Sequence, residues 1–249
     1  MTEGSLGIWS TLRDPQAAIA LAQEPFGWIA IDQQHGFARP GDTLDILTAL
    51  RNWNGRKYVR VAENSFAEIG RALDNGADGV IVPMINSPHE ARAAVEATRF
   101  PPVGRRSWGP YRGGAAANAT PEEINATIEC LVMIETAEGL GSVKEIAAVP
   151  GVTGVFVGLF DLACALGITV HDLLNAQDAG APLSHIVSAA RDAGITAAAF
   201  GGSGDTSRIL TEAGFHLTAV ITDVDAIVLG AVLATTAASP QPKDGRSDT

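Results

Sequence analysis

The sequence has few of the residues that mark several large classes of protein. Its two cysteines, Cys130 and Cys164, form no CxxC pair and are too few to staple a chain of 249 residues. The net charge is −11, from 17 basic and 28 acidic side chains. An acidic chain lacks the basic patches that bind nucleic acid or an anionic membrane. A small anionic substrate stays open, because a bound divalent cation can reverse the charge of a local site.

Long apolar runs are missing as well. No run approaches the roughly 20 residues that a membrane-spanning helix needs. The first ten residues also lack the basic region and the apolar stretch of a signal peptide. With 46% hydrophobic residues the chain has enough apolar side chains for a substantial core. We therefore expect a reduced, cytoplasmic protein without nucleic-acid or membrane partners.

Short apolar runs alternate with amphipathic stretches at intervals of about 20 to 30 residues, the spacing of βα units. Eight runs are predicted as strands: residues 7–10, 28–32, 57–61, 79–85, 130–135, 154–158, 196–200 and 218–222. Most are continuously apolar, as expected of parallel strands buried on both faces. No GxGxxG follows the first strand and no GxxxxGK[ST] occurs. We predict a single-domain (β/α)₈ barrel over residues 1–238, with eight helices, followed by a disordered tail over 239–249.

Two carboxylates occupy positions where a barrel places its active site, at the carboxyl ends of the strands. Glu135 closes the fifth strand, and Asp161 follows the sixth at a distance of 26 residues, one βα repeat. Two close carboxylates repel each other unless a proton or a cation lies between them. With oxygen ligands the cation is Mg²⁺, Mn²⁺ or Co²⁺. The alternative, two helix N-caps over the βα loops, stays open.

Arg60 and His35 are the other polar candidates. Arg60 lies inside an apolar strand, where a guanidinium needs an anion: either Asp32 or Glu135 in a buried ion pair, or a substrate oxyanion, which we favour. His35 follows Asp32 in a glycine-containing loop, and a neutral imidazole beside a carboxylate can act as a general base. A purely structural role for this histidine stays open.

Two glycine-containing loops have less specific sequences. Residues 101–109, rich in glycine, proline and arginine, suit an active-site lid or an oligomer contact. Residues 201–204, Gly-Gly-Ser-Gly, follow the seventh strand, where barrels often bind phosphate, but a flexible connection explains them equally well.

Taken together, these segments resemble the HpcH/HpaI aldolase family, the metal-dependent class II pyruvate aldolases related to 4-hydroxy-2-oxoheptanedioate aldolase and 2-keto-3-deoxyrhamnonate aldolase. The resemblance runs from about residue 7 to residue 233. It is carried by Gly-Ile-Trp at 7–9, Asp32 with His35, Val59-Arg60, Leu73-Asp74-Asn75-Gly76-Ala77, Val82-Pro83-Met84, the run from Phe100 to Arg106, Ile134-Glu135-Thr136, and Gly158 followed by Asp161-Leu162.

The resemblance implies an aldolase of aromatic-compound or sugar-acid catabolism. It would cleave 4-hydroxy-2-oxoacids to an aldehyde and pyruvate, or a close 2-oxoacid such as hydroxypyruvate, through a metal-stabilised enolate. In the family the metal ligands match Glu135 and Asp161. The arginine matching Arg60 stabilises the enolate oxygen, and the histidine matching His35, with Asp32 beside it, acts as base through a metal-bound water. No lysine Schiff base is required.

Other family positions are assigned to the substrate and to the oligomer. Substrate contacts are implied for Arg60, Met133, Gly158, Phe160, Asp161 and Phe200. Met133 stands where glutamine is common, Phe160 adds bulk beside the oxoacid, and Gln34 replaces a common acid, so the acceptor and the nucleophile stay open. Asp74 matches an aspartate that strengthens the histidine, yet it closes a helix leading to the opposite end of the barrel. We expect a neighbouring subunit to supply it in a homo-oligomer, a hexamer built as a trimer of dimers.

Three alternatives remain on the same frame: an oxaloacetate decarboxylase, a citryl-CoA-type lyase, and a non-catalytic barrel that binds oxoacids.

Overall fold

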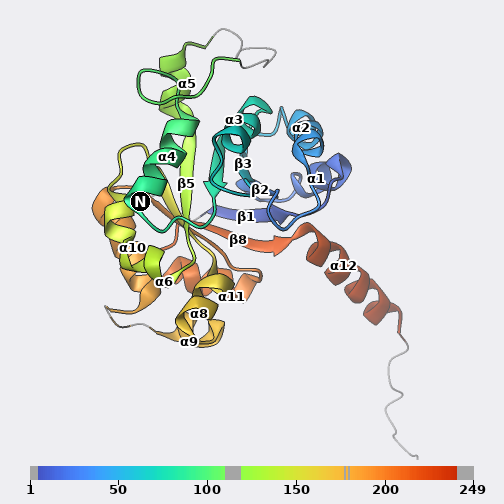
Figure 1. The fold of residues 1–249 in the computed structure, drawn as a ribbon. Helices are drawn as coiled ribbons and strands as arrows, with labels where there is room; N and C mark the ends of the chain where they lie inside the picture. The colour runs from blue at the N-terminus through green and yellow to red at the C-terminus, as the bar shows by residue number, and fades with distance from the viewer. Residues whose placement is uncertain (1–4, 110–118, 177, 179, 240–249) are drawn as a thin grey trace, which may run out of the picture.

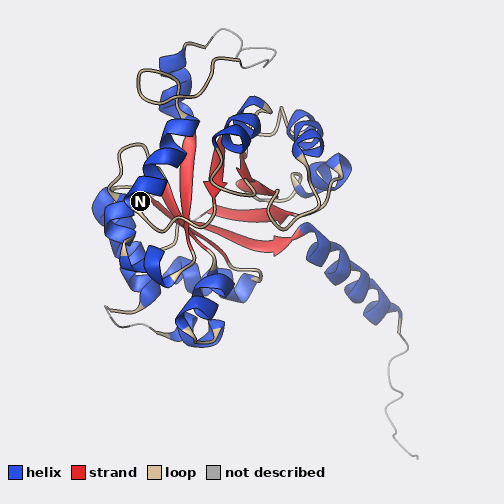
Figure 2. Ribbon diagram, in the orientation of Figure 1, coloured by secondary structure: helices blue, strands red, loops and turns tan. Residues whose placement is uncertain are grey.

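A closed barrel of eight parallel strands, hydrogen-bonded in chain order, forms the centre of the molecule (Figures 1 and 2). The computed structural model describes residues 5–109, 119–176, 178 and 180–239. The strands are β1 (Ser5–Ser10), β2 (Trp28–Asp32), β3 (Arg56–Arg60), β4 (Gly79–Val82), β5 (Glu129–Ile134), β6 (Gly154–Val157), β7 (Thr196–Phe200) and β8 (Leu217–Thr222). The predicted (β/α)₈ barrel is therefore confirmed, while the tail over residues 240–249 lies outside the described residues.

Helices follow the strands, and several βα units carry short extra ones, so the predicted count of eight was too low. The described residues form α1 (Pro15–Leu21), α2 (Pro40–Ala49), α3 (Phe66–Asp74), α4 (Pro88–Thr98), α5 (Pro121–Thr127), α6 (Ala137–Gly141), α7 (Val143–Ala147), α8 (Leu159–Leu166), α9 (Val170–Asn175), α10 (Pro182–Ala193), α11 (Gly204–Glu212) and α12 (Asp223–Ala238). Their caps are local in origin: Thr120 and Glu123, for example, form the capping box that their spacing predicts at the start of α5.

The predicted fourth strand, 79–85, is too long. In the structure β4 ends at Val82. The next residue, Pro83, has no N–H to donate to a neighbouring strand, and Met84 adopts a φ of 58°, outside the extended region. The chain therefore turns away from the sheet two residues after the strand, close to the mouth of the barrel.

Side chains alternate between two cores because the period of a strand is two. The larger core fills the space between the strands and the helices. The smaller fills the barrel itself, where large rings such as Trp28 and Phe156 pack against small residues such as Ala198. Gly7 shows how closely this interior is packed, because a Cβ there would lie 2.0 Å from the Trp28 ring. Asp32, Arg60 and Met133 lie two residues beyond Ala30, Tyr58 and Leu131 of this inner core. They therefore face the inside of the barrel at the carboxyl ends of β2, β3 and β5.

Helix α12 projects away from the barrel in Figure 1 instead of lying along it. Only its first turn is anchored: the Asp223 carboxylate accepts hydrogen bonds from Ser10 Oγ and from the backbone N–H groups of Thr11 and Leu12, at 2.9–3.0 Å. Beyond that turn its apolar side chains are exposed, with Ile227 at 59% and Leu233 at 62%. No described helix combines the length and the apolar character needed to cross a membrane.

Candidate active site

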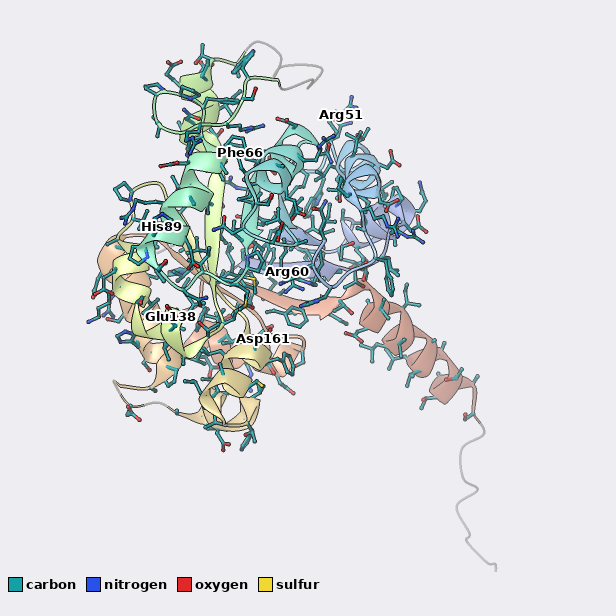
Figure 3. All side chains as sticks on the ribbon, in the orientation of Figure 1. Arg51, Arg60, Phe66, His89, Glu138 and Asp161 are labelled. Atoms are coloured by element: carbon teal, nitrogen blue, oxygen red, sulfur yellow. The ribbon has the colours of Figure 1, made fainter. Side chains whose placement is uncertain are left out.

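Residues from the carboxyl ends of six strands line one cavity of about 280 Å³ at the mouth of the barrel. Arg60 and Asp161, both labelled in Figure 3, lie at this end. The lining residues are Trp9, His35, Arg60, Met133, Phe156, Gly158, Leu159, Phe160, Asp161 and Phe200. Most of the residues that the sequence nominated are thus brought together, although they come from segments up to about 190 residues apart along the chain. A larger cavity of about 460 Å³, between α9, α10 and α11, has only Glu212 as an ionisable lining residue among those described.

Arg60 forms a two-point ion pair with Asp32, its neighbour across the β2–β3 register. Its Nε donates to Asp32 Oδ1 at 2.8 Å and its Nη2 to Oδ2 at 2.6 Å. Both residues are buried, at 8% and 1% exposure. The fork-to-carboxylate geometry fixes the plane of the guanidinium. Of the three partners open to Arg60 from the sequence, Asp32 forms the buried ion pair. The substrate oxyanion that we favour stays a prediction, and Arg60 does line the cavity where it would bind.

Trp9 completes this network from the first strand. Its indole Nε1 donates to Asp32 Oδ2 at 3.3 Å, and the Arg60 guanidinium lies 5.0 Å from the centre of its ring. The ring also packs against Phe156 and Phe200, each at 5.4 Å between centroids. Arg60 is therefore held both by a carboxylate and by an aromatic face, in a cation–π contact.

Asp32 remains ionised at neutral pH. Burial alone would raise its pKa, but the hydrogen bonds and charge of Arg60, with the backbone N–H groups of His35 and Gln34, outweigh it and lower the pKa below the ordinary value. The contact with His35 is made to its backbone N–H, at 3.2 Å. Asp32 therefore orders the loop that carries His35, whose side chain is exposed at the cavity.

Glu135 is a buried carboxylate, 3% exposed, at the end of β5. Its Oε1 accepts a 2.6 Å hydrogen bond from the backbone N–H of Met84. Burial raises the pKa of Glu135, the Met84 N–H opposes that change, and the negative charge of Asp161 raises the pKa further. The positive charges of Arg60 and His35 lower it. The two carboxylates thus stand close enough to repel each other, as their spacing in the sequence predicts.

Neither carboxylate caps a helix, so the alternative reading of the pair as N-caps is wrong. Thr136 is the N-cap of helix α6, which follows Glu135, and its hydroxyl accepts from Gly139 N–H. Gly158 is the N-cap of helix α8, and Asp161 lies inside the first turn of that helix. The described residues contain no cluster of three or more His, Cys, Asp or Glu side chains suited to a metal ion. The chain itself therefore offers two carboxylates, a ligand set that Mg²⁺ accepts because it retains water.

The walls of the cavity are close to these groups. A Cβ at Gly158 would stand 2.8 Å from Glu135 Oε2 and 3.3 Å from the end of the Met133 side chain, so a larger residue there would displace the Glu135 carboxylate. Met133 is buried at 2%, whereas Phe160 is 63% exposed at the rim. Phe200, at the end of β7, packs on Trp9. Glycine backbone at 158 thus lets α8 approach the carboxylate of Glu135.

Asp74 does not join the site within one chain. It ends α3 and binds Arg106, whose Nη2 donates to Asp74 Oδ1 at 2.6 Å. Both line a different cavity of about 640 Å³ beside α2 and α3. The 101–109 loop is therefore tied to α3 in this structure, through a buried arginine. A catalytic role for Asp74 remains a prediction that requires a second subunit.

The glycine-rich 201–204 segment is held to β8. The backbone N–H groups of Gly201 and Gly202 both donate to the carbonyl of Ala219, at 2.9 and 3.1 Å, and Ser203 caps α11. The N–H groups of Gly201 and Gly202 therefore already have a partner within the protein. This favours the interpretation of the segment as a connection over its interpretation as a phosphate site.

Four residues of the site, Trp9, Phe156, Leu159 and Met84, are not assigned to it from the sequence. Trp9 and Phe156 are inward-facing aromatics that look like ordinary core, although the period of two would have placed them on the same face as Arg60 and Met133. Met84 contacts Glu135 through its backbone, and no side-chain pattern signals such a contact.

Comparisons with known proteins identify relatives of this chain. The family described as HpcH/HpaI aldolase/citrate lyase matches residues 5–228. A hydroxypyruvate/pyruvate aldolase of Paraburkholderia phytofirmans is 35% identical over 235 residues, 90% of this chain and 88% of that protein. A protein of the same name from Sagittula stellata is 37% identical over 166 residues, and the match spans 65% of each chain, just under two thirds.

A solved structure extends the agreement to the fold. The crystal structure of an HpcH/HpaI aldolase/citrate lyase family protein from Burkholderia cenocepacia J2315 superposes with a TM-score of 0.86, at 31% identity and 95% coverage of both chains. Relatives named as aldolases support an aldolase role for this barrel. The chain belongs to the HpcH/HpaI aldolase/citrate lyase family.

Proposed function

We propose that this protein is a metal-dependent lyase that reversibly cleaves 4-hydroxy-2-oxoacids to an aldehyde and pyruvate, or a close 2-oxoacid such as hydroxypyruvate. The observation that carries the proposal is that His35, Arg60 and Asp161 line one cavity. Glu135 lies close enough that the charges of all three change its pKa. The names of the aligned hydroxypyruvate/pyruvate aldolases support the same class of nucleophile.

The proposed cofactor is Mg²⁺, Mn²⁺ or Co²⁺, held by Glu135 and Asp161. The donor set fits: the negative charge of Asp161 raises the pKa of Glu135, and Glu135 Oε2 receives no hydrogen bond within the described part of the chain. When bound, the cation would polarise the keto group and offset the negative charge that develops on its oxygen.

Arg60 stabilises the same oxygen in this proposal. Asp32 accepts from Nε and from Nη2, which leaves Nη1 and the second N–H of Nη2 as donors for a substrate oxygen, and the ion pair keeps the guanidinium from rotating. His35 lies exposed at the cavity and takes the proton from the methyl carbon of the oxoacid. The N–H groups of Phe160 and Asp161, in the first turn of α8, suit the substrate carboxylate. Met133, Phe156 and Phe200 supply apolar walls that exclude water.

Deuterium exchange tests this chemistry without knowledge of the aldehyde. The protein is incubated with pyruvate in D₂O, with Mn²⁺ or with EDTA, and the methyl signal is followed by NMR. We expect exchange that EDTA abolishes. The His35→Ala variant should exchange about 100-fold more slowly, as expected when a general base is lost. The matched variant His89→Ala, which changes an exposed histidine on α4, should match the wild type (Figure 3). Lack of exchange with every divalent ion would favour a non-catalytic oxoacid-binding barrel.

Two rivals share the enolate step, and the family description includes citrate lyases. An oxaloacetate decarboxylase would release CO₂ from oxaloacetate faster than it makes pyruvate from any 4-hydroxy-2-oxoacid. A citryl-CoA-type lyase would need a basic groove for the CoA phosphates, which a chain of net charge −11 provides poorly. Parallel assays of pyruvate release from oxaloacetate and from a panel of 4-hydroxy-2-oxoacids separate these activities.

We also propose a homo-oligomer, a trimer of dimers, in the cytoplasm. Support comes from α12, where Ile227, Val228 and Leu233 are all more than half exposed, which is more apolar surface than scattered single residues provide. Asp74 lies on a cavity outside its own active site, so a catalytic role for it would need a neighbouring chain. Light scattering on the purified protein should give six chain masses. A monomer with full activity would contradict both the assembly and the role of Asp74.

A further inference from the structure

Met84 has a backbone conformation that its side chain does not explain. Its φ is 58°, and within the described residues it is the one non-glycine residue with a positive φ. This left-handed region is unfavourable for a residue that carries a Cβ. The Met84 side chain is 50% exposed, so buried packing does not compensate for the conformation. Such residues persist where the surrounding structure holds them, often beside functional groups.

With this conformation, the N–H groups of Met84 and Ile85 both point toward the carboxyl end of β5. Met84 N–H donates to Glu135 Oε1 at 2.6 Å, and Ile85 N–H donates to the carbonyl of Met133 at 3.2 Å. Pro83, just before them, has no N–H. Ile85 is 1% exposed and anchors the segment on the far side. The chain leaving β4 is therefore fastened across the carboxyl end of β5, with one of its bonds on a catalytic-site carboxylate.

The bond selects one oxygen of Glu135, and the other accepts no hydrogen bond from the described residues. Oε1 is occupied by Met84, whereas Oε2 lies toward Gly158, where a Cβ would be 2.8 Å away. Gly158 precedes the first turn of α8, which carries Asp161. Oε2 thus lies on the side of the second carboxylate.

We propose that Met84 is a positioning residue: its left-handed backbone holds Oε1 of Glu135 so that Oε2 is presented to a divalent cation shared with Asp161. The role belongs to the backbone and is independent of the thioether. It rests on the proposed function in one respect, namely that a cation binds to Glu135 and Asp161.

Variants at position 84 separate the backbone from the side chain. Glycine keeps the N–H and adopts positive φ freely. Leucine and isoleucine have the same atoms, but isoleucine branches at Cβ, which makes positive φ far less accessible. Mn²⁺ affinity is measured on the full-length protein from the electron paramagnetic resonance signal of free Mn²⁺, and circular dichroism checks the fold.

We expect Met84→Gly to bind Mn²⁺ as the wild type does, Met84→Leu to stay close to it, and Met84→Ile to bind about 10- to 100-fold more weakly, the usual cost of losing a partner that orients a metal ligand. Equal affinities in all three variants would overturn the proposal. So would a loss in Met84→Gly as large as that in Met84→Ile, because it would assign the role to the side chain.

A second measurement needs no variant at position 84 and no metal. Amide hydrogen exchange is followed by NMR in EDTA for the wild type, for Glu135→Ala and for the control Glu138→Ala, which changes a nearby glutamate on α6 (Figure 3). The Met84 amide should lose at least about tenfold in protection in Glu135→Ala, and in that variant alone, since exchange reports the local hydrogen bond. Unchanged protection overturns the contact even if Met84→Ile does not fold. Wild-type protein that protects this amide but binds no Mn²⁺ refutes the metal site and leaves the contact intact.

Discussion

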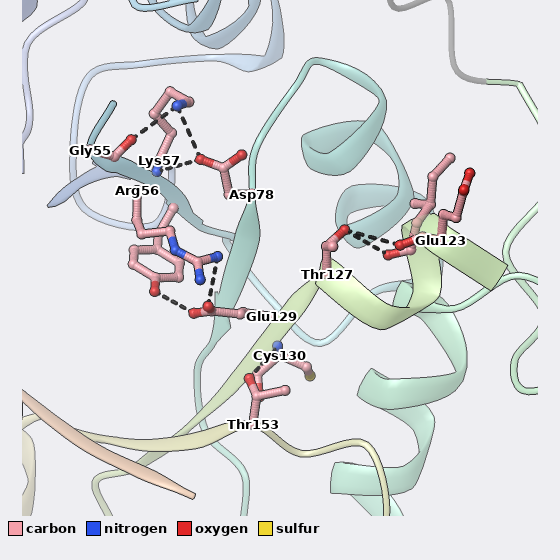
Figure 4. Close-up of polar contacts among 11 residues, drawn as sticks. Gly55, Arg56, Lys57, Asp78, Glu123, Thr127, Glu129, Cys130 and Thr153 are labelled. Atoms are coloured by element: carbon pink, nitrogen blue, oxygen red, sulfur yellow. Dashed lines mark hydrogen bonds and ion pairs between the residues drawn. The ribbon is translucent and has the colours of Figure 1, made fainter. Parts of the chain in front are cut away.

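The two ends of the barrel use ionisable groups in opposite ways. At the amino end, the charged side chains at the starts of β3 and β5 have partners in the same chain: Lys57 pairs with Asp78 at 3.1 Å, and Arg56 pairs with Glu129 at 2.8 Å (Figure 4). Tyr58 donates its hydroxyl to the same Glu129. These pairs are partly exposed and close the bottom of the barrel.

At the carboxyl end, only one ion pair, Asp32 with Arg60, is complete among the groups that meet at the cavity. Glu135 is buried but bound by a single backbone N–H, and Asp161 and His35 are exposed at the rim. Burying a carboxylate without a cationic partner destabilises a fold, so this arrangement is expected where a ligand supplies the missing charge. The contrast separates groups that hold the barrel together from groups that act on a substrate.

The same substitution at each end tests the comparison most strongly. Glu135→Gln should lower the rate of pyruvate methyl exchange by at least about 1,000-fold, because it removes the charge that holds the cation and with it the electrostatic stabilisation. Glu129→Gln, at the amino end, should exchange at the wild-type rate. The measurement is the NMR assay in D₂O with Mn²⁺. Similar losses in both variants would show that the two ends do not differ in this way.

Asp32→Asn should lower the free energy of unfolding by about 3 kcal/mol at pH 7, since it leaves Arg60 buried without its counter-charge. In the folded protein the pKa of Asp32 is lower than its ordinary value of 3.8. The ionised carboxylate therefore contributes its full stabilisation when the pH is above 3.8. This stabilisation is lost as the pH falls below 3.8 and through the pKa of the folded protein. Urea unfolding of both proteins between pH 7 and pH 3 should show the difference shrinking at the acid end.

Asp78→Asn is the matched control for this change. Its partner Lys57 is largely buried but Asp78 itself is about one third exposed, so the loss should be about 1 kcal/mol or less. A loss at position 78 as large as that at position 32 would mean that burial at the mouth is not what makes the Asp32 pair important.

The sequence predicted the barrel because each strand is a continuous apolar run between turn signals; residues 28–32 and 196–200 were placed with the correct ends. It also placed Glu135 and Asp161 together, since one βα repeat fixes the angle between neighbouring strand ends. It failed at 79–85 because Met84 departs from the extended region for a tertiary hydrogen bond that its side chain does not signal. Asp74 could not be placed either, because its proposed partner belongs to another chain.

Gly158→Ala probes the mouth by shape alone. The new Cβ would lie 2.8 Å from Glu135 Oε2, and displacement of this oxygen should weaken Mn²⁺ binding by about 10- to 100-fold, as for other changes that misplace a metal ligand. Gly141→Ala, where no atom outside its own helix backbone lies within 4 Å of the added Cβ, should leave Mn²⁺ affinity unchanged. Titration with free Mn²⁺ measures both. Equal affinity in Gly158→Ala would argue that Oε2 does not face the cation.

Tyr58→Phe should have the smallest effect, and it tests the amino end alone. Removal of the hydroxyl deletes the hydrogen bond to Glu129 but leaves the ring, which packs edge-on against Trp28 at 5.9 Å between centroids. Glu129 keeps Arg56, so no charge loses its partner, and the free energy of unfolding should fall by about 1 kcal/mol, a typical net hydrogen bond. Mn²⁺ affinity and methyl exchange should not change. If either did, the interior between the two ends, filled by Trp28 and Phe156, would be transmitting a displacement to the mouth, and the ends could not be treated as independent.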